Sequence, residues 1–133
     1  MADLPKSILI SDDDANLREV LSAKLEKAGF LVEQASGGEE CIEKAKKNKP
    51  DLVLLDVLMP PGISGIQTLA KMKADPELAN IKVLFLTNLG EAQDENNWVD
   101  DKFAKDAGAL GHMKKTDDLD KIVARIKQEL SIA

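Results

Sequence analysis

Leu52-Val53-Leu54-Leu55-Asp56 is the stretch of the sequence that decides the fold. Four consecutive aliphatic residues without polar alternation are typical of a strand that is buried on both faces, as in the interior of a parallel sheet. The aspartate that follows them is then placed at the carboxyl end of that strand. On either side of this stretch, short aliphatic runs alternate with amphipathic segments along the chain.

Five segments are predicted to be strands, and a segment with helical spacing follows each of them. Ser36, with Glu39 three residues later, predicts a capping box at the start of the second helix. The strands are expected at residues 7–11, 31–35, 52–56, 81–87 and 109–113. The helices are expected at residues 17–28, 36–47, 65–74, 98–108 and 119–130. This strict alternation favours a parallel sheet with helices on both faces.

The composition of the strands predicts their order in the sheet. The first, third and fourth are continuously aliphatic, whereas the second and fifth are mixed, and mixed strands belong at the edges. The order 2-1-3-4-5 satisfies this condition. The expected fold class is therefore α/β, a flavodoxin-like doubly wound (βα)5 arrangement. Ligand sites of this fold lie at the carboxyl ends of the first and third strands, where the winding reverses.

Polar side chains stand at the predicted carboxyl ends. Asp12 and Asp13 follow the first strand, Asp56 ends the third, Thr87 ends the fourth, and Lys115 follows the fifth. Carboxylates brought this close repel one another unless a cation neutralises them, and hard oxygen ligands with open solvent positions suit Mg²⁺. A hydroxyl and an ammonium group beside a metal-bound carboxylate match the oxygens of a phosphoryl group.

Each of these side chains also has a purely structural explanation when it is taken singly. An Asp-rich turn after a strand is usually a helix N-cap, and Asp14 is the residue expected in that role. Thr87 can simply end a strand, and Lys115 can be a solvated charge. Cys41, at helical spacing with other apolar residues, is expected in the core. The functional interpretation depends on all the polar groups meeting at one edge.

Composition limits the possible functions. The 133 residues carry 18 Lys and Arg against 24 Asp and Glu, a net charge of −6, so direct nucleic-acid binding is not expected. No aliphatic run approaches the ~18 residues that span a bilayer, and the N-terminus lacks an apolar signal core. The single cysteine suits a reducing cytoplasm. We expect one cytoplasmic domain over residues 1–133, with its core at about 6–131 and no membrane insertion.

Four segments resemble, in the same order, the receiver domains of two-component response regulators. They are Ile8-Leu9-Ile10-Ser11-Asp12-Asp13-Asp14, the stretch from Asp51 to Pro60 with Gly65 after it, Val83-Leu84-Phe85-Leu86-Thr87, and Gly108-Ala109 followed by His112-Met113-Lys114-Lys115. The resemblance covers essentially the whole chain and points to the stand-alone, CheY-like type.

This resemblance implies a role for each residue of the acidic site. Asp56 would accept a phosphoryl group from a phosphohistidine of a sensor histidine kinase or a histidine phosphotransfer protein. Asp13 and Asp56 would ligate Mg²⁺ directly, Asp12 would do so chiefly through water, and the backbone carbonyl of Leu58 would complete the protein ligands. The chain would thus be a phosphoacceptor switch and not a turnover enzyme.

The resemblance also implies how the signal would leave the site. Thr87 and Lys115 would contact phosphoryl oxygens, and Thr87 would move a surface made by residues 98–108, 109–113 and 119–130. His112 stands where many relatives carry a switching aromatic residue; it is either a pH-sensitive switch or a half-exposed side chain. The chain ends at Ala133, so we expect no effector domain, a separate output protein, and a monomer or a phosphorylation-dependent dimer.

Three departures from the family pattern affect these expectations. Thr116 stands where proline is usual after the lysine, the loop at residues 59–65 is one residue longer, and residues 87–108 form a longer segment than usual. Leu58 and Leu89 replace polar side chains that orient a hydrolytic water in many relatives, which predicts slow self-dephosphorylation.

Three alternative functions remain open at this stage. A Mg²⁺-dependent phosphohydrolase with an aspartyl intermediate at Asp56 would need a general acid two residues later, where this chain has Leu58. A degenerate receiver would bind partners without phosphorylation, but the acidic residues, Thr87 and Lys115 are all present. A flavodoxin is disfavoured because the acidic loop after the first strand would repel a phosphate.

Overall fold

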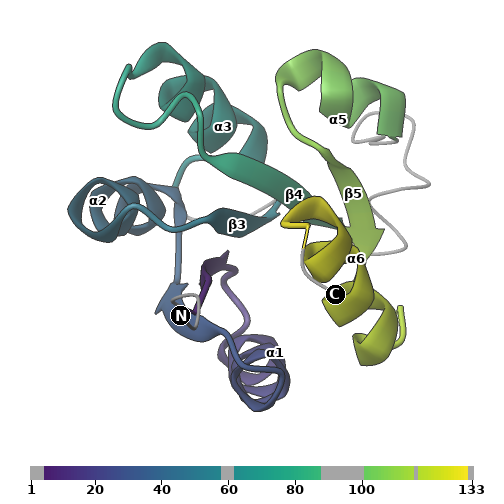
Figure 1. Cartoon of the computed structure of the whole chain (residues 1–133). Helices are drawn as coiled ribbons and strands as arrows, with labels where there is room; N and C mark the ends of the chain where they lie inside the picture. The colour runs from purple at the N-terminus through teal and green to yellow at the C-terminus, as the bar shows by residue number, and fades with distance from the viewer. Residues whose placement is uncertain (1–4, 58–61, 88–100, 116, 132–133) are drawn as a thin grey trace.

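The computed structural model describes residues 5–57, 62–87, 101–115 and 117–131 (Figure 1). Five strands in this part of the chain form one parallel sheet of order β2-β1-β3-β4-β5, as predicted. The strands are β1 Ser7–Ser11, β2 Leu31–Ala35, β3 Leu52–Asp56, β4 Lys82–Thr87 and β5 Gly111–Lys114. The helices are α1 Ala15–Lys27, α2 Gly38–Asn48, α3 Gly65–Ala74, α5 Asp101–Ala107 and α6 Leu119–Glu129.

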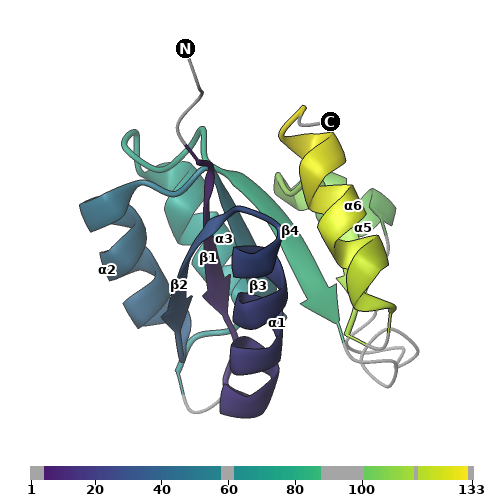
Figure 2. The same cartoon turned by 60° about the horizontal axis from the view of Figure 1, so that its bottom comes forward.

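The sheet separates two apolar layers, and β3 contributes to both because successive side chains point to opposite faces. Val53 and Leu55 belong to the layer under α2, α3 and α5, whereas Leu52 and Leu54 belong to the layer under α1 and α6. Figures 1 and 2 show these two helix groups on opposite sides of the sheet. Every residue of β3 is buried, which confirms the prediction of an inner strand.

Helix termini follow local side-chain chemistry. The Asp14 carboxylate accepts hydrogen bonds from the backbone N–H groups of Asn16 and Leu17, so Asp14 is the predicted N-cap of α1. The helix ends before Gly29, whose φ of 102° lies in the left-handed region that glycine tolerates.

The predicted capping box at Ser36 is wrong. The N-cap of α2 is Gly37, and both the backbone N–H and the hydroxyl of Ser36 donate to Oε1 of Glu40 instead. A capping box is present at α3, where the Ser64 hydroxyl accepts from the backbone N–H of Gln67 and the Gln67 side chain accepts from that of Ser64. The motif of a serine followed three residues later by Glu or Gln thus forms a capping box at Ser64 but not at Ser36.

The last strand begins two residues later than predicted. Ala109 N–H donates to the carbonyl of Ala104 and so ends α5, and the first residue of β5 that pairs with β4 is Gly111, opposite Leu84. The predicted start of the preceding helix at Trp98 lies outside the described residues. Within the described part of the chain, no helix is long and apolar enough to cross a membrane.

Cys41 lies in the core, as predicted. Its side chain is fully buried on α2 against the sheet, near the Ser11 hydroxyl. Burial raises the pKa of the Cys41 thiol to about 11, so the thiol is protonated at neutral pH.

Candidate functional site

Two neighbouring inner strands bring the acidic residues together. Ser11 of β1 pairs with Leu55 of β3, so Asp12 and Asp56, the next residue in each chain segment, emerge side by side at the carboxyl edge. Carboxylate oxygens of Asp12, Asp13 and Asp56 all lie within 4.8 Å of one another. Asp12 and Asp56 are buried, whereas Asp13 is exposed to solvent. The structure therefore assembles the predicted acidic cluster from two segments that are distant in sequence.

Asp12 is fixed by contacts to its backbone and to both carboxylate oxygens. Its backbone N–H donates to the Ala35 carbonyl of β2 at 3.1 Å, and its Oδ1 accepts the Asp14 N–H at 2.9 Å. Its Oδ2 lies 2.9 Å from the ammonium of Lys115. Burial raises the pKa of the Asp12 carboxyl, although the Asp14 N–H and the Lys115 ammonium oppose this shift by stabilising the charged form.

Lys115 is the cation that the protein itself supplies to this cluster. Its Nζ lies 2.9 Å from Oδ2 of Asp12 and 3.0 Å from Oδ1 of Asp56. The backbone N–H of Lys115 donates to the Thr87 carbonyl at 2.8 Å, which ties the end of β5 to the end of β4. Burial alone would lower the pKa of Lys115, but the two carboxylates outweigh it and hold that pKa above its usual value.

Thr87 ends β4 directly beside β3 and is completely buried. Among the described residues, its hydroxyl oxygen has no hydrogen-bond partner. A buried hydroxyl without a partner costs about 1–3 kcal/mol, so such groups are uncommon in a resting core. At the edge of the acidic cluster, the Thr87 hydroxyl can donate a hydrogen bond to an oxygen atom of a bound ligand.

Helix α3 packs directly against the backbone of Asp56. The N–H of Gly65 donates to the Val57 carbonyl at 2.7 Å, and a Cβ added at Gly65 would lie 2.0 Å from the backbone oxygen of Asp56. Only glycine allows this approach. Gly65 therefore fixes where the chain leaves β3, and with it the direction in which Asp56 faces.

The donor set fits a divalent cation with oxygen ligands. Three carboxylates, two of them buried and one open to solvent, offer hard oxygens and leave positions for water, which is the pattern that Mg²⁺ prefers. The Lys115 ammonium lies close enough to balance part of their charge. This arrangement suits a metal ion with an anionic oxygen group beside it.

The positions of the other predicted residues differ. His112 lies in the middle of the edge strand β5, opposite Phe85 and partly buried, and so is set back from the carboxyl edge. Leu58, Leu89 and Thr116 lie outside the described residues. Sequence reasoning missed Arg18, whose guanidinium contacts the backbone oxygen of Asp12. The available signal was that this chain has 16 lysines but only two arginines, at positions 18 and 125.

A doubly wound sheet of this order, with buried aspartates and a lysine at its carboxyl edge, defines the class of receiver domains. Residues 8–127 match the family described as the response regulator receiver domain. The chain belongs to this family.

Two similar proteins illustrate the relationship. Sporulation initiation phosphotransferase F of Bacillus subtilis is 35% identical over 127 residues, which cover 96% of this chain and 95% of that protein. A CpxR homolog of Haemophilus influenzae, a transcriptional regulatory protein, is 37% identical over 120 residues and 48% of its length. The chain spans about half the length of the transcriptional regulators it matches.

The fold is shared with solved receiver structures. A response regulator receiver domain protein (CheY-like) from Methanospirillum hungatei superimposes with a TM-score of 0.81 at 26% identity, covering 96% of this chain and 94% of that one. The names of these relatives describe a phosphotransferase, a transcriptional regulatory protein and a response regulator receiver domain protein.

Proposed function

We propose that this chain is a single-domain response regulator that accepts a phosphoryl group on Asp56 in the presence of Mg²⁺. The donor would be the phosphohistidine of a sensor kinase or of a histidine phosphotransfer protein. Residues 6–131 would form the one receiver domain, acting in the cytoplasm and passing its signal to a separate output protein. The observation that carries the proposal is the Lys115 ammonium, held between the carboxylates of Asp12 and Asp56 at 2.9 and 3.0 Å.

The chemistry assigns a task to each side chain. A carboxylate oxygen of Asp56 attacks phosphorus in line, the P–O bond to Asp56 forms, and the P–N bond to the donor imidazole breaks. Lys115 can move from Asp56 to a phosphoryl oxygen while it keeps Asp12, and the buried Thr87 hydroxyl can donate to another. The magnesium ion, held by Asp12, Asp13 and Asp56 with the Leu58 carbonyl, would neutralise charge on the phosphoryl oxygens.

Output would begin at Thr87. A hydroxyl drawn toward the phosphoryl group shifts the end of β4, and the Lys115 N–H bond to the Thr87 carbonyl couples that shift to β5. The surface of α5, β5 and α6 would then change between two packing states, with His112 on its central strand. The name of the Bacillus subtilis relative, a phosphotransferase, supports a phosphorelay role.

The test is phosphorylation by a small phosphoramidate with Mg²⁺, read by intact-protein mass. We expect one phosphoryl group on the wild type and none on Asp56→Asn. Asp51→Asn is the matched control, because Asp51 lies at the opposite end of β3 and is exposed. Phosphorylation of Asp56→Asn at the wild-type rate, or a wild type that is never modified, would contradict the proposal.

The same experiment separates a switch from a hydrolase. The sequence predicts slow loss of the phosphoryl group because Leu58 and Leu89 offer no hydrogen bond to a water. Removing an orienting group raises a barrier by ~1–3 kcal/mol, or about 5- to 150-fold in rate. Decay should therefore be slow in the wild type and faster in Leu58→Asn with Leu89→Glu. Rapid multiple turnover of the phosphodonor would favour the phosphohydrolase.

A further inference from the structure

We propose that Arg18 is a positioning residue that holds the turn at Asp12 and Asp13 in the geometry that selects Mg²⁺ over larger cations. The inference rests on the proposed function, because it concerns the same metal site. It assigns a role to a side chain that would not itself touch the metal or the phosphoryl group.

Two hydrogen bonds place the guanidinium of Arg18 between the turn and the sheet. Its Nη1 donates to the backbone oxygen of Asp12 at 2.6 Å, and its Nε donates to Oε1 of Gln34 on β2 at 3.1 Å. Both bonds are partly buried, so water competes with them less than at an open surface. The planar guanidinium group therefore joins the turn at Asp12 and Asp13 to the edge strand β2.

The Gln34 end of this connection is itself anchored. The backbone oxygen of Gln34 accepts a hydrogen bond from the Lys44 ammonium at 2.5 Å, and Lys44 also pairs with Glu40 at 3.4 Å on the same face of α2. The neighbouring Ala35 carbonyl accepts the backbone N–H of Asp12. The turn is thus tied to β2 twice, once through its own backbone and once through Arg18.

Arginine suits this position better than lysine. Nε and Nη1 belong to one rigid plane, so a single side chain donates in two fixed directions, whereas an ammonium is a point charge on a flexible stem. The chain uses lysine for 16 of its 18 basic residues. An arginine next to the acidic cluster is therefore an exception to the chain's own composition.

The clamped oxygen is part of the peptide that joins Asp12 to Asp13. Asp13 is the exposed member of the cluster, and its carboxylate lies within 4.8 Å of those of Asp12 and Asp56. Because that peptide carries the Asp13 backbone, its orientation affects where the Asp13 carboxylate lies. Mg²⁺ demands near-ideal octahedral geometry, whereas Ca²⁺ accepts flexible sites. Releasing the peptide should therefore weaken Mg²⁺ binding more than Ca²⁺ binding.

The experiment compares three variants by following the thermal unfolding midpoint through separate Mg²⁺ and Ca²⁺ titrations. Arg18→Lys keeps the charge but removes the planar fork. Gln34→Ala leaves Arg18 in place and removes its support. Arg125→Lys is the matched control, because the other arginine makes the same kinds of contact, to Glu129 and to the Leu110 carbonyl, away from the site.

We expect Arg18→Lys to weaken Mg²⁺ binding roughly tenfold, the lower end of the effect of losing a group that orients a metal ligand. Binding of Ca²⁺ should weaken less, so the preference for Mg²⁺ over Ca²⁺ should fall. Gln34→Ala should shift the preference in the same direction by a smaller factor. Arg125→Lys should keep the wild-type preference, even where it lowers stability.

Several results would overturn the inference. One is a wild-type metal preference in Arg18→Lys. If Arg18→Lys does not fold, an unchanged preference in Gln34→Ala has the same meaning. A loss of preference in Arg125→Lys as well would assign the effect to general stability. A wild type that does not respond to Mg²⁺ at all would refute the proposed metal site together with this inference, and so differs from a failure of Arg18 alone.

Discussion

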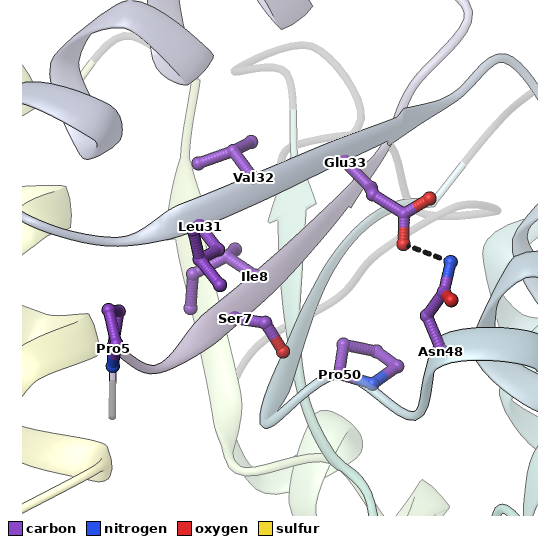
Figure 3. A pocket seen from close by; sticks show the side chains of 8 residues that line it. All are labelled: Pro5, Ser7, Ile8, Leu31, Val32, Glu33, Asn48 and Pro50. Atoms are coloured by element: carbon purple, nitrogen blue, oxygen red, sulfur yellow. Dashed lines mark hydrogen bonds between the residues drawn. The ribbon is translucent and has the colours of Figure 1, made fainter. Parts of the chain in front are cut away.

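The two ends of the sheet differ in how far their polar groups are buried. At the carboxyl end, Asp12, Asp56 and Thr87 are almost completely buried beside the Lys115 ammonium. At the amino end, a pocket of about 340 Å³ is open and its polar groups are partly or fully exposed (Figure 3). Its lining residues are Pro5, Ser7, Ile8, Leu31, Val32, Glu33, Asn48 and Pro50.

Polar groups at the amino end are paired with one another. The backbone N–H of Ser7 donates to Oδ2 of Asp51 at 2.8 Å. The Asn48 amide donates to Oε1 of Glu33 at 2.7 Å (Figure 3). Burying charge is costly unless it is matched, and at the carboxyl end the Lys115 ammonium supplies that match. The same strands therefore have one end with buried charged groups and one end with exposed, paired polar groups.

The largest effect is expected from removing the central cation. Lys115→Met should lower the free energy of unfolding by about 3 kcal/mol in metal-free protein at pH 7, because two buried carboxylates lose the Lys115 ammonium. Lys114→Met, at an exposed neighbour, should change it by less than about 0.5 kcal/mol. Urea unfolding measures both, and equal stability of the two variants would refute the contrast.

A second variant tests the seating of α3 on Asp56. Gly65→Ala should cost about 2 kcal/mol, because its Cβ would meet a backbone oxygen that cannot move away cheaply. Gly37→Ala is the control: its Cβ would meet nothing within 4 Å, and its φ of −165° suits any residue. Urea unfolding of both should show a small loss for Gly37→Ala. A loss of similar size in the two would mean that α3 adjusts freely.

At the amino end, the expected effect is smaller and does not reach the metal site. Asp51→Ala should cost about 1 kcal/mol through the loss of its hydrogen bonds with Ser7. The rise in the unfolding midpoint on adding Mg²⁺ should stay at the wild-type value. A changed Mg²⁺ response in Asp51→Ala would show that the two ends are energetically coupled.

The smallest expected effect is on the pH dependence of stability, to which Asp12 and Glu40 contribute with opposite signs. Burial raises the pKa of Asp12, so its contribution to stability is largest below the unfolded pKa and falls as the pH rises through the folded pKa. The Ser36 N–H lowers the pKa of Glu40, so that contribution is present above the unfolded pKa and is lost on acidification.

Metal-free Asp12→Asn should therefore gain stability relative to the wild type as the pH rises from about 4, the unfolded value for an aspartate, toward 7. Glu40→Gln should lose its disadvantage as the pH falls toward 4. Urea unfolding across this range checks both signs, and parallel curves for all three proteins would refute them.

The sequence was sufficient to predict the sheet order, because aliphatic continuity distinguishes inner from edge strands. It also predicted the meeting of Asp12, Asp13, Asp56 and Lys115, because the carboxyl ends of parallel strands share one edge. Both predictions depend only on the aliphatic runs that mark the strands and on the polar residues that follow those runs.

Details that depend on tertiary contact were not predictable in the same way. Ser36 lies in a capping pattern, but its backbone N–H and its hydroxyl both donate to the Glu40 carboxylate instead. Ala109 is apolar enough for a strand, yet its N–H is used to end α5. The contact between Arg18 and the Asp12 carbonyl joins a side chain to a backbone atom, so the scarcity of arginine could draw attention to Arg18 but not identify its partner.

The Cys41 thiol is a natural reporter of the local separation of α2 from the sheet. A thiol reagent needs an accessible thiolate, and the single cysteine of the chain is fully buried with a pKa of about 11. Labelling therefore requires α2 to separate from the sheet. The labelling rate measures how often this separation occurs. A ligand bound at the carboxyl edge should slow the labelling as far as it stabilises the closed state, so binding can be followed without an engineered probe.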